Sequence, residues 1–387
     1  MTKTVVFAFD LTEASQIRRI ASLLHLGHQV TSLSFRRGNM ATDFVPTWPN
    51  VDLGHMPNQQ FLKRIMCLLR ALPRVVLNLG ALRDADILIA RNFDLLVLAW
   101  FARVCLIGRR PKLIYECLDI HSLFTGTGAV SRLMRWLERA LLRRIDLLWV
   151  SSPGFIRCYF EPVQGYRGPH ALIENKLWFD GPSPPRPDRR DRGAGRPVTI
   201  GWVGSIRCQA SLDLLTGLAE RLGDAVQIAI HGNIHRHAVP EFDQAIGRFD
   251  TITYHGPYTY PDDLGRVYAD CDAVWAQDLW QRGGNSDWLL PNRIYEASWF
   301  GCPSIAVSDT ETGRRVESAG LGFTIAQPTP DALADLVRDL TPDRLAAASR
   351  RLLTMPDRAF RLDLDDVAKA LAAVDAHQEI RFSLSKP

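Results

Sequence analysis

Between Phe179 and Arg207 the sequence reads FDGPSPPRPDRRDRGAGRPVTIGWVGSIR. Its first part, residues 179–197, is rich in proline, glycine and charged residues and offers almost nothing that a core could bury, so it predicts an exposed linker. At Val198 an apolar run begins that is typical of a buried strand. The stretch therefore predicts a domain boundary within the 387 residues, with a second folded domain after it.

Short apolar runs of strand type alternate with helical patterns on both sides of this linker. The strands expected before it are residues 5–9, 30–35, 87–90, 113–116 and 147–151, and those expected after it are 198–203, 226–231, 252–255, 273–276, 304–307 and 322–325. Such alternation predicts the α/β class, with parallel sheets covered by crossover helices.

The domain organisation follows from the same pattern. We expect one α/β domain over residues 1–178, the linker over 179–197, and a second α/β domain over 198–355. The closing residues 356–387 are expected to form a helix and tail that can pack back onto the first domain.

Composition places the chain among folded cytoplasmic proteins. Hydrophobic residues make up 47% and charged residues 23%, which argues against disorder, collagen-like repeats and coiled coil. The seven cysteines are odd in number and form no CxxC pair, so reduced thiols and a cytoplasmic location are expected. No run approaches the roughly 18 apolar residues of a membrane-spanning helix, and the start of the chain is expected to be a strand, not a signal peptide.

The net charge of +4 hides an asymmetry, because basic residues outnumber acidic ones in the first 180 residues and the reverse holds afterwards. Residues 61–76 and 131–144 place leucine, methionine and tryptophan beside repeated arginine and lysine. These basic amphipathic patterns are typical of helices that lie on an anionic membrane, and equally of helices packed on a sheet with wet basic faces. No nucleic-acid reading motif accompanies them, so nucleic acid is not expected as a partner.

The segment Gly201-Trp-Val-Gly-Ser-Ile-Arg207 carries the first candidate site. A buried strand is predicted to end there and lead into a helix, so that backbone amides near Gly204 and Ser205 would face a ligand. With Arg207 alongside, such a turn can bind a diphosphate. A plain strand-to-helix turn remains the alternative.

The second candidate is Leu290-Pro-Asn-Arg-Ile-Tyr-Glu296, which leads through Gly301 into a strand. Asn292 is expected to cap a short helix that ends at Gly301. Arg293 and Glu296 are three residues apart and can look out of one helix face, the cation toward phosphate and the carboxylate toward ribose hydroxyls. An exposed ion pair is the alternative.

Together, G-x-x-G-S-x-R after the linker and P-N-R-x-x-E-A-x-x-x-G-x-P before a strand resemble the donor domain of bacterial GT-B glycosyltransferases. The resemblance implies two Rossmann-like domains facing each other across a cleft, and a nucleotide-sugar substrate such as a UDP- or GDP-sugar. It also implies the donor-binding residues: Gly204, Ser205 and Arg207 for the diphosphate, Asn292 and Arg293 beside it, Glu296 for ribose and Gly313 for the sugar.

One departure from the family bears on stereochemistry. Retaining relatives commonly carry a second carboxylate eight positions before the ribose glutamate, where this chain has Trp288. Asn285, Ser286 or Asp287 are the alternatives for contact with the sugar. The sequence leaves retaining and inverting courses open.

The segment Tyr115-Glu-Cys-Leu-Asp119-Ile-His121 directly follows a predicted strand, at the edge where open α/β sheets bind ligands. By resemblance to inverting GT-B enzymes of exopolysaccharide assembly, Asp119 is the candidate base and His121 its neighbour in the catalytic site. An Asp-x-His pair can equally cap the next helix. Asp10, after the first strand, is an acceptor-side candidate.

Neither a metal nor a cofactor is expected. Asp84-Ala-Asp86 imitates a metal-binding DxD motif, but it immediately precedes a strand and is expected to open it. His231, His235 and His237 suggest zinc, yet their spacing with other ligand types is unconvincing, and a loop or nucleotide-side role is favoured.

The resemblance implies transfer of a sugar to a glycan or a polyprenyl-diphosphate-linked acceptor in bacterial cell-surface polysaccharide synthesis, including lipopolysaccharide. Such an enzyme would work peripherally at the cytoplasmic face of the inner membrane. A nucleotide-sugar epimerase and a non-catalytic nucleotide-sugar or glycan-binding protein are the alternatives. A dinucleotide oxidoreductase is disfavoured, since the segment after Phe9 lacks G-x-G-x-x-G.

Overall fold

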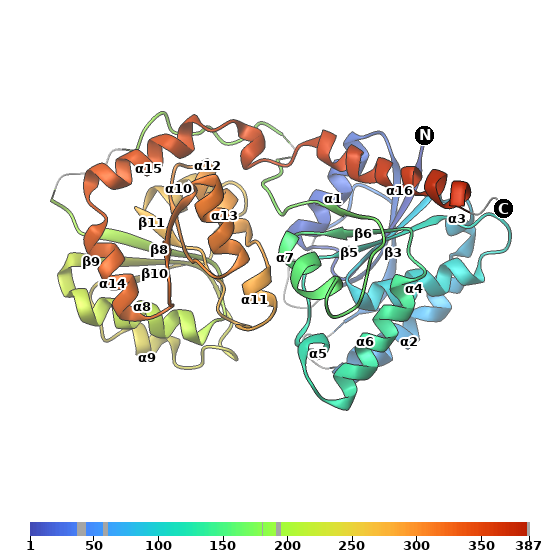
Figure 1. The fold of residues 1–387 in the computed structure, drawn as a ribbon, viewed down its shortest axis with the longest axis horizontal. Helices are drawn as coiled ribbons and strands as arrows, with labels where there is room; N and C mark the ends of the chain where they lie inside the picture. The colour runs from blue at the N-terminus through green and yellow to red at the C-terminus, as the bar shows by residue number, and fades with distance from the viewer. Residues whose placement is uncertain (37–43, 57–60, 180, 191–194, 385–387) are drawn as a thin grey trace. The chain divides into compact units, whose positions relative to one another are not determined.

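The computed structural model describes residues 1–36, 44–56, 61–179, 181–190 and 195–384. By their contacts these divide into two compact units, one of residues 1–174 with 363–387 and the other of Asn175–Leu362. Each unit is a parallel sheet with helices on its faces (Figure 1).

The described residues of the first unit form a seven-stranded sheet in the order β3-β2-β1-β4-β5-β6-β7. Its strands are β1 (Lys3–Ala8), β2 (Gln29–Arg36), β3 (Asn50–His55), β4 (Ile87–Arg91), β5 (Lys112–Cys117), β6 (Leu147–Val150) and β7 (His170–Leu172). Its helices are α1 (Ala14–His25), α2 (Phe61–Leu77), α3 (Leu79–Arg83), α4 (Phe93–Cys105), α5 (Ser122–Thr125), α6 (Ala129–Leu142), α7 (Pro153–Phe155), the π-helix η1 (Ile156–Phe160) and α16 (Leu364–Leu384).

Two edge strands of this sheet, β3 and β7, were not predicted. β3 has the mixed burial of an edge strand and β7 is only three residues long, so neither produces the continuous apolar run that marked the central strands.

The described residues of the second unit form a six-stranded sheet in the order β10-β9-β8-β11-β12-β13. Its strands are β8 (Val198–Ile206), β9 (Val226–Ile234), β10 (Ile252–Gly256), β11 (Ala273–Trp275), β12 (Ser304–Val307) and β13 (Gly322–Ile325). Its helices are α8 (Gln209–Leu222), α9 (Phe242–Ile246), α10 (Leu264–Ala269), α11 (Asn285–Trp288), α12 (Asn292–Trp299), α13 (Glu311–Ala319), α14 (Pro330–Asp339) and α15 (Pro342–Thr354), with 3-10 turns η2 (Gly223–Ala225) and η3 (Asp357–Ala359).

The core of the second unit lies on both faces of its sheet. Alternate side chains of β8 point to opposite faces, so Trp202 packs under α8 and α14 while Val203 packs under α10 and α12. Both faces being buried explains why these strands are almost continuously apolar. The predicted α/β class is confirmed.

In the segment predicted to be an exposed linker, none of the described residues 181–190 and 195–197 is buried, but two side chains attach the segment to the second unit. Phe179 is buried against Trp299, and the Arg186 guanidinium stacks on the same tryptophan while donating to the Met355 and Leu352 carbonyls at 2.7 and 2.6 Å. Composition hid this packing, because a guanidinium can be held by several helix-end carbonyls at once. The second unit accordingly begins at Asn175.

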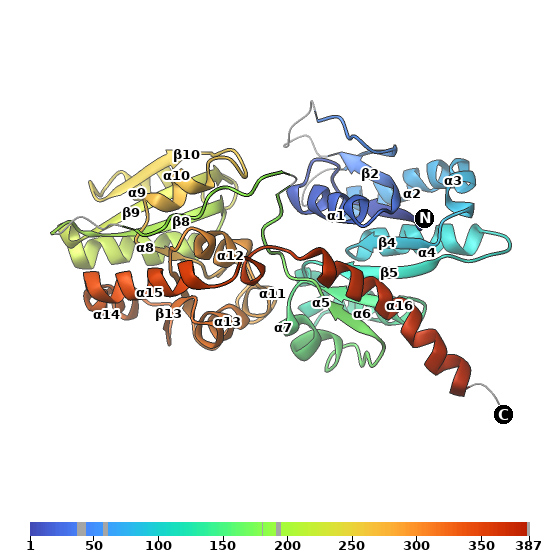
Figure 2. The same ribbon diagram turned by 90° about the horizontal axis from the view of Figure 1, so that it is seen from above.

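Helix α16 belongs to the first unit, where it packs on α1, β6 and β7 (Figure 2). Val367 and Val374 are buried in that contact, and the Trp149 indole donates to the Ala370 carbonyl at 3.3 Å. The last helix of the chain thus completes the core of the first unit.

Candidate functional site

A pocket of about 240 Å³ opens in the second unit at the carboxyl end of β8. It is lined by Trp202, Val203, Gly204, Ser205, Arg207, Cys208, Ser211, Tyr258, Gln277, Asp278, Pro291, Asn292, Arg293 and Glu296. Six of the seven predicted donor-binding residues lie in this lining; Gly313 is the exception. The motifs around residues 204 and 293, some 90 positions apart, therefore meet in one place.

Strand β8 continues to Ile206, so the predicted turn at Gly204 and Ser205 is wrong in detail. Gly204 pairs with Gly232 of β9, and both have positive φ, at 112° and 138°. A Cβ at Gly232 would lie 1.8 Å from the Gly204 carbonyl oxygen, so this close approach requires glycine.

Two guanidinium groups give the pocket its positive charge. The Arg207 side chain is 47% exposed, lies 3.7 Å from the Asp278 carboxylate, and stands over the Trp280 ring. The Arg293 guanidinium lies near Gly204, since a Cβ placed on that glycine would be 3.8 Å from Arg293 Nη2. Both cations therefore lie near the backbone expected to receive a diphosphate.

Glu296 is 6% exposed and accepts a hydrogen bond from the Tyr268 hydroxyl at 3.0 Å. Burial, and then the Glu296 carboxylate, raise the pKa of Tyr268, which stays a donor at neutral pH. The same two causes raise the pKa of Tyr258, which also lines the pocket. The buried Tyr268 hydroxyl thus holds the Glu296 carboxylate, and Glu296 lines the pocket from helix α12.

Asn292 is the first residue of α12, and its expected role as the cap is wrong, because the cap position is Pro291. Pro291 has an extended backbone there, and no side-chain hydrogen bond caps the helix. Asn292 belongs to the pocket lining together with Arg293 and Glu296. The helix ends before Gly301, whose φ of 67° is the expected left-handed stop.

Gly313 lies inside α13, where a Cβ would come within 2.0 Å of the Val307 carbonyl oxygen. Its amide donates to the Thr310 hydroxyl at 3.0 Å. The close packing of α13 on β12 thus explains why residue 313 is a glycine. A contact between Gly313 and the sugar stays a prediction.

Trp288 ends the short helix α11 and is not among the residues that line the pocket. Of the three alternatives, Ser286 accepts from the Gln281 amide at 2.7 Å, and Asp287 is engaged by Arg282 at 2.9 Å. Asn285 is buried in the same turn. These groups hold the loop in which they lie.

In the first unit, Asp119 and His121 follow the carboxyl end of β5, and both are exposed. His121 is the N-cap of α5, where its Nδ1 accepts from the Leu123 amide at 3.2 Å. Burial and then the Arg64 charge lower the pKa of His121, so the ring is neutral at pH 7 with its proton on Nε2. The cap alternative therefore applies to His121.

Asp10 is 1% exposed and follows β1. Its Oδ1 accepts from the Thr12 amide at 3.0 Å and from the Thr12 hydroxyl at 2.8 Å. These bonds fix the turn into α1, and a role toward the acceptor stays a prediction.

Sequence reasoning missed the residues that hold the loop around Asp119. The Asn92 side chain, at a positive φ of 70°, accepts from the Leu118 amide at 3.2 Å, and the Ser151 hydroxyl donates to the Leu118 carbonyl at 3.2 Å. A non-glycine residue at positive φ was the one signal, but it is visible only in the folded backbone.

Another group that the sequence did not reveal lies near His121. Arg64 of α2 pairs with Asp94 of α4, its Nε 3.0 Å from the carboxylate, and its guanidinium stacks over the Phe9 ring. Because α2 and α4 are distant in sequence, no local spacing of residues could have predicted the Arg64–Asp94 pair.

A buried ion network lies beneath these loops. Glu116, 2% exposed, receives Arg19 Nη2 at 2.8 Å and Arg91 Nε at 3.0 Å. Burial opposes ionisation, but the two guanidinium groups lower the pKa of Glu116, so it is a carboxylate at neutral pH. Strand β5, which leads to Asp119, is thus fixed by charge as well as by packing.

The Asp84-Ala-Asp86 motif is bound to cations of the protein itself. Asp86 accepts from the Lys3 amide at 2.8 Å and pairs with Arg109 at 2.8 Å, while Asp84 meets the Lys3 ammonium. The motif joins the starts of β1 and β4.

The chain forms two parallel-sheet units, and one of them has a pocket lined by glycine and arginine at its central strand. This architecture is the GT-B class of fold. Sucrose-phosphate synthase (tll1590) from Thermosynechococcus elongatus is similar with a TM-score of 0.70 at 14% identity, over 99% of both chains. Anabaena Alr3699/HepE, solved with UDP and glucose, is similar with a TM-score of 0.66 at 16% identity, also over 99% of both chains. The predicted GT-B fold is confirmed.

Sequence comparison then gives the family. Residues 15–176 match the glycosyl transferase 4-like domain. The succinoglycan biosynthesis protein ExoL of Rhizobium meliloti (strain 1021) is 34% identical over 355 residues, 91% of this chain and 88% of ExoL. The chain belongs to the GT-B, family-4-like glycosyltransferases, and it is a glycosyltransferase in polysaccharide biosynthesis.

Proposed function

We propose that the pocket of the second unit binds a nucleoside-diphosphate sugar, with the diphosphate on the Gly204 backbone, Arg207 and Arg293, and the ribose on Glu296. The observation that carries the proposal is the meeting of these residues in one pocket. UDP is the first nucleotide to test, because Alr3699/HepE was solved with UDP and with UDP-glucose.

Titration calorimetry with UDP and with GDP tests the donor site. Removing the carboxylate in Glu296→Ala takes away the acceptor for ribose hydroxyls and is expected to weaken UDP binding about tenfold or more. Glu220→Ala, an exposed carboxylate on α8, is the matched control. Equal affinities in the two variants would contradict the assignment.

We propose that the first unit presents the acceptor hydroxyl to Asp119. In an inverting course Asp119 takes the hydroxyl proton while the acceptor oxygen bonds to the anomeric carbon and the nucleoside diphosphate leaves. Arg207 and Arg293 stabilise the charge on the leaving diphosphate, so the chemistry requires no cofactor and no divalent ion at that position. Added Mg²⁺ or Mn²⁺ is expected to leave the transfer rate unchanged.

The acceptor is proposed to be a glycan or a polyprenyl-diphosphate-linked saccharide at an anionic inner-membrane surface. Helices α2 and α6 both pack on α4 and leave apolar side chains outward, with Leu69 53%, Leu133 55% and Trp136 61% exposed. Exposed basic residues, among them Arg70 and Arg132, lie beside them. In the described part of the chain, no helix has the length and apolar character needed to cross a bilayer.

Vesicle sedimentation tests this docking. The chain is expected to bind vesicles of phosphatidylcholine with phosphatidylglycerol and to ignore phosphatidylcholine alone, because both apolar burial and anionic charge are required. Trp136→Glu should reduce binding, whereas Leu24→Glu, on the exposed side of α1, should not. Equal binding to vesicles with and without phosphatidylglycerol would contradict the proposal.

A further inference from the structure

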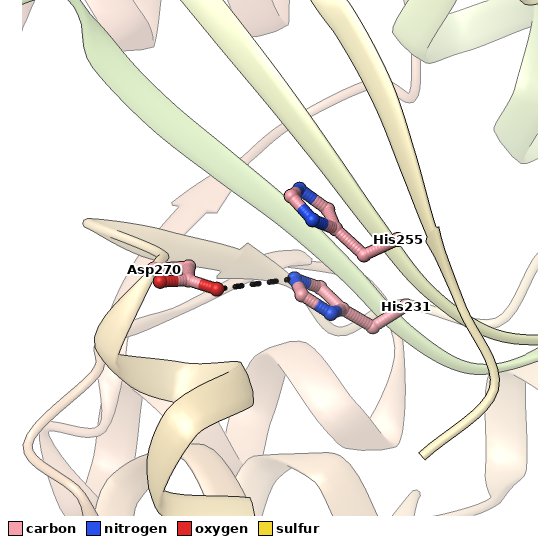
Figure 3. A group of neighbouring side chains, drawn as sticks. All are labelled: His231, His255 and Asp270. Atoms are coloured by element: carbon pink, nitrogen blue, oxygen red, sulfur yellow. Dashed lines mark ion pairs between the residues drawn. The ribbon is translucent and has the colours of Figure 1, made fainter.

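Three side chains from separate elements of the second unit converge beside the pocket (Figure 3). His231 lies in β9, His255 in β10, and Asp270 directly after α10. Their ligand atoms all lie within 4.8 Å of one another, and the two imidazole rings are stacked with centroids 4.4 Å apart.

The buried member of the group makes no hydrogen bond through its Nε2. His231 is 1% exposed, and its Nε2 makes no hydrogen bond. The nearest carboxylate oxygen, Oδ2 of Asp270, is 4.0 Å away, which is too long for a hydrogen bond. A buried ring nitrogen without a hydrogen bond, close to a carboxylate and a second imidazole, is an arrangement that a bound cation would satisfy.

We propose that His231, His255 and Asp270 form a zinc-binding site. Two imidazoles and a carboxylate are ligands that Zn²⁺ takes at about 2.0–2.2 Å, which places ligand atoms about 3.4 Å apart around a tetrahedral ion. The distances here exceed that by an ångström or so, and closing them requires His255 to tilt out of its stack. His255 is exposed and Asp270 is 45% exposed, so both are free to turn toward the fixed His231.

The position of the site suggests what the ion would do. His231 pairs in the sheet with Val203, which lines the pocket, and His255 is three residues before Tyr258, which also lines it. The ion would tie the ends of β9 and β10 to the end of α10 and so hold the Tyr258 loop. This is a structural role, separate from the diphosphate charges borne by Arg207 and Arg293.

The three histidines noted in the sequence, His231, His235 and His237, have different surroundings in the structure. His235 and His237 contact each other edge to face at 5.8 Å, and among the described residues it is His231 that joins a metal-binding geometry. Its partners come from β10 and α10, which no histidine spacing within the loop could reveal.

The test is metal binding by the full chain, freed of any affinity tag, stripped with a chelator and loaded with Zn²⁺. After desalting, mass spectrometry of the metal is expected to give about one zinc per chain, and Co²⁺ is expected to give the strong visible bands of a tetrahedral site. His255→Ala and Asp270→Asn should each weaken zinc binding about tenfold or more. His237→Ala, an exposed histidine nearby, should bind as the unaltered chain does.

Both decisive variants change exposed side chains, so they are expected to fold, and thermal melting checks this. Zinc should raise Tm in the unaltered chain and in His237→Ala, but not in His255→Ala, because binding to the native state alone stabilises it. Zinc below a fifth of an equivalent, or equal retention by His255→Ala and His237→Ala, would overturn the site. Neither measurement uses a nucleotide sugar or a sugar acceptor. The result is therefore independent of the proposed transfer reaction.

Discussion

The pocket of the second unit and the loop after β5 in the first unit use different physical means to place their functional groups. In the pocket, Glu296 and Arg293 project from one helix and Gly204 from one strand, so regular backbone sets their positions. In the first unit, Asp119 is exposed on a loop that is held from below by Asn92 and Ser151. The pocket is built on a helix and a strand, whereas the candidate base depends on the side chains that hold its loop.

This contrast between the pocket and the loop predicts which property a mutation in each should change. Residues of the pocket should change affinity, because they meet a ligand that is bound in the ground state. Residues of the first-unit loop should change turnover or stability, because they act on the proton transfer or on the loop itself.

The largest effect is expected from Asp119→Asn. An amide cannot take the acceptor proton, so turnover should fall about 10²–10⁴-fold, while UDP affinity stays within about twofold of normal. Initial-rate kinetics and calorimetry measure the two quantities, with Glu161→Gln as an exposed control in the same unit. Undiminished turnover would show that Asp119 is not the base and would favour a retaining course.

The support of that loop is broken by Glu116→Gln. The change leaves Arg19 and Arg91 buried without their counter-ion, which is expected to cost about 3–5 kcal/mol and to lower the melting temperature of the first unit. Differential scanning calorimetry measures the loss, with Glu220→Gln in the second unit as control. A melting temperature like that of the control would mean that packing alone holds β5.

The same region should respond to pH through Glu138. Burial raises the pKa of Glu138 from 4.5 to about 7, while the hydrogen bonds from Tyr159, Tyr115 and Gln164 oppose the shift. Because the folded pKa is raised, the carboxyl group contributes stability fully below about pH 4.5 and loses it as pH rises through 7, a change of about 3 kcal/mol at most.

Thermal melting of Glu138→Gln across pH 5 to 8 checks this. The amide does not titrate, so the variant should gain relative to the unaltered chain as the pH rises. Parallel curves for the two proteins would show that Glu138 does not ionise in this range.

The smallest effect is expected from Arg207→Lys. Lysine keeps the charge but loses the planar group that stacks on Trp280 and meets Asp278, so UDP affinity should fall about threefold to tenfold. Calorimetry measures this, and Arg221→Lys on α8 is the control. A purely kinetic defect with unchanged affinity would move Arg207 to the reacting end of the donor.

The α/β class was predictable, and the two motifs that meet in the pocket were recognisable, because their signals are local. Apolar runs marked the central strands, and G-x-x-G-S-x-R and P-N-R-x-x-E each lie within one short segment. The edge strands β3 and β7 were missed because they are only partly buried. The cap predicted at Asn292 was misplaced by one residue, since the helix begins at Asn292 itself and no side chain caps it at Pro291.

Local sequence signals fixed the central strands, the helices between them and the two motifs, because each of these depends on neighbours in the chain. The tertiary structure alone decided that Tyr258 and Asp278 line the pocket and that His231 meets His255 and Asp270. Those meetings follow from the strand order β10-β9-β8-β11, which brings remote segments side by side and leaves no periodic trace along the chain.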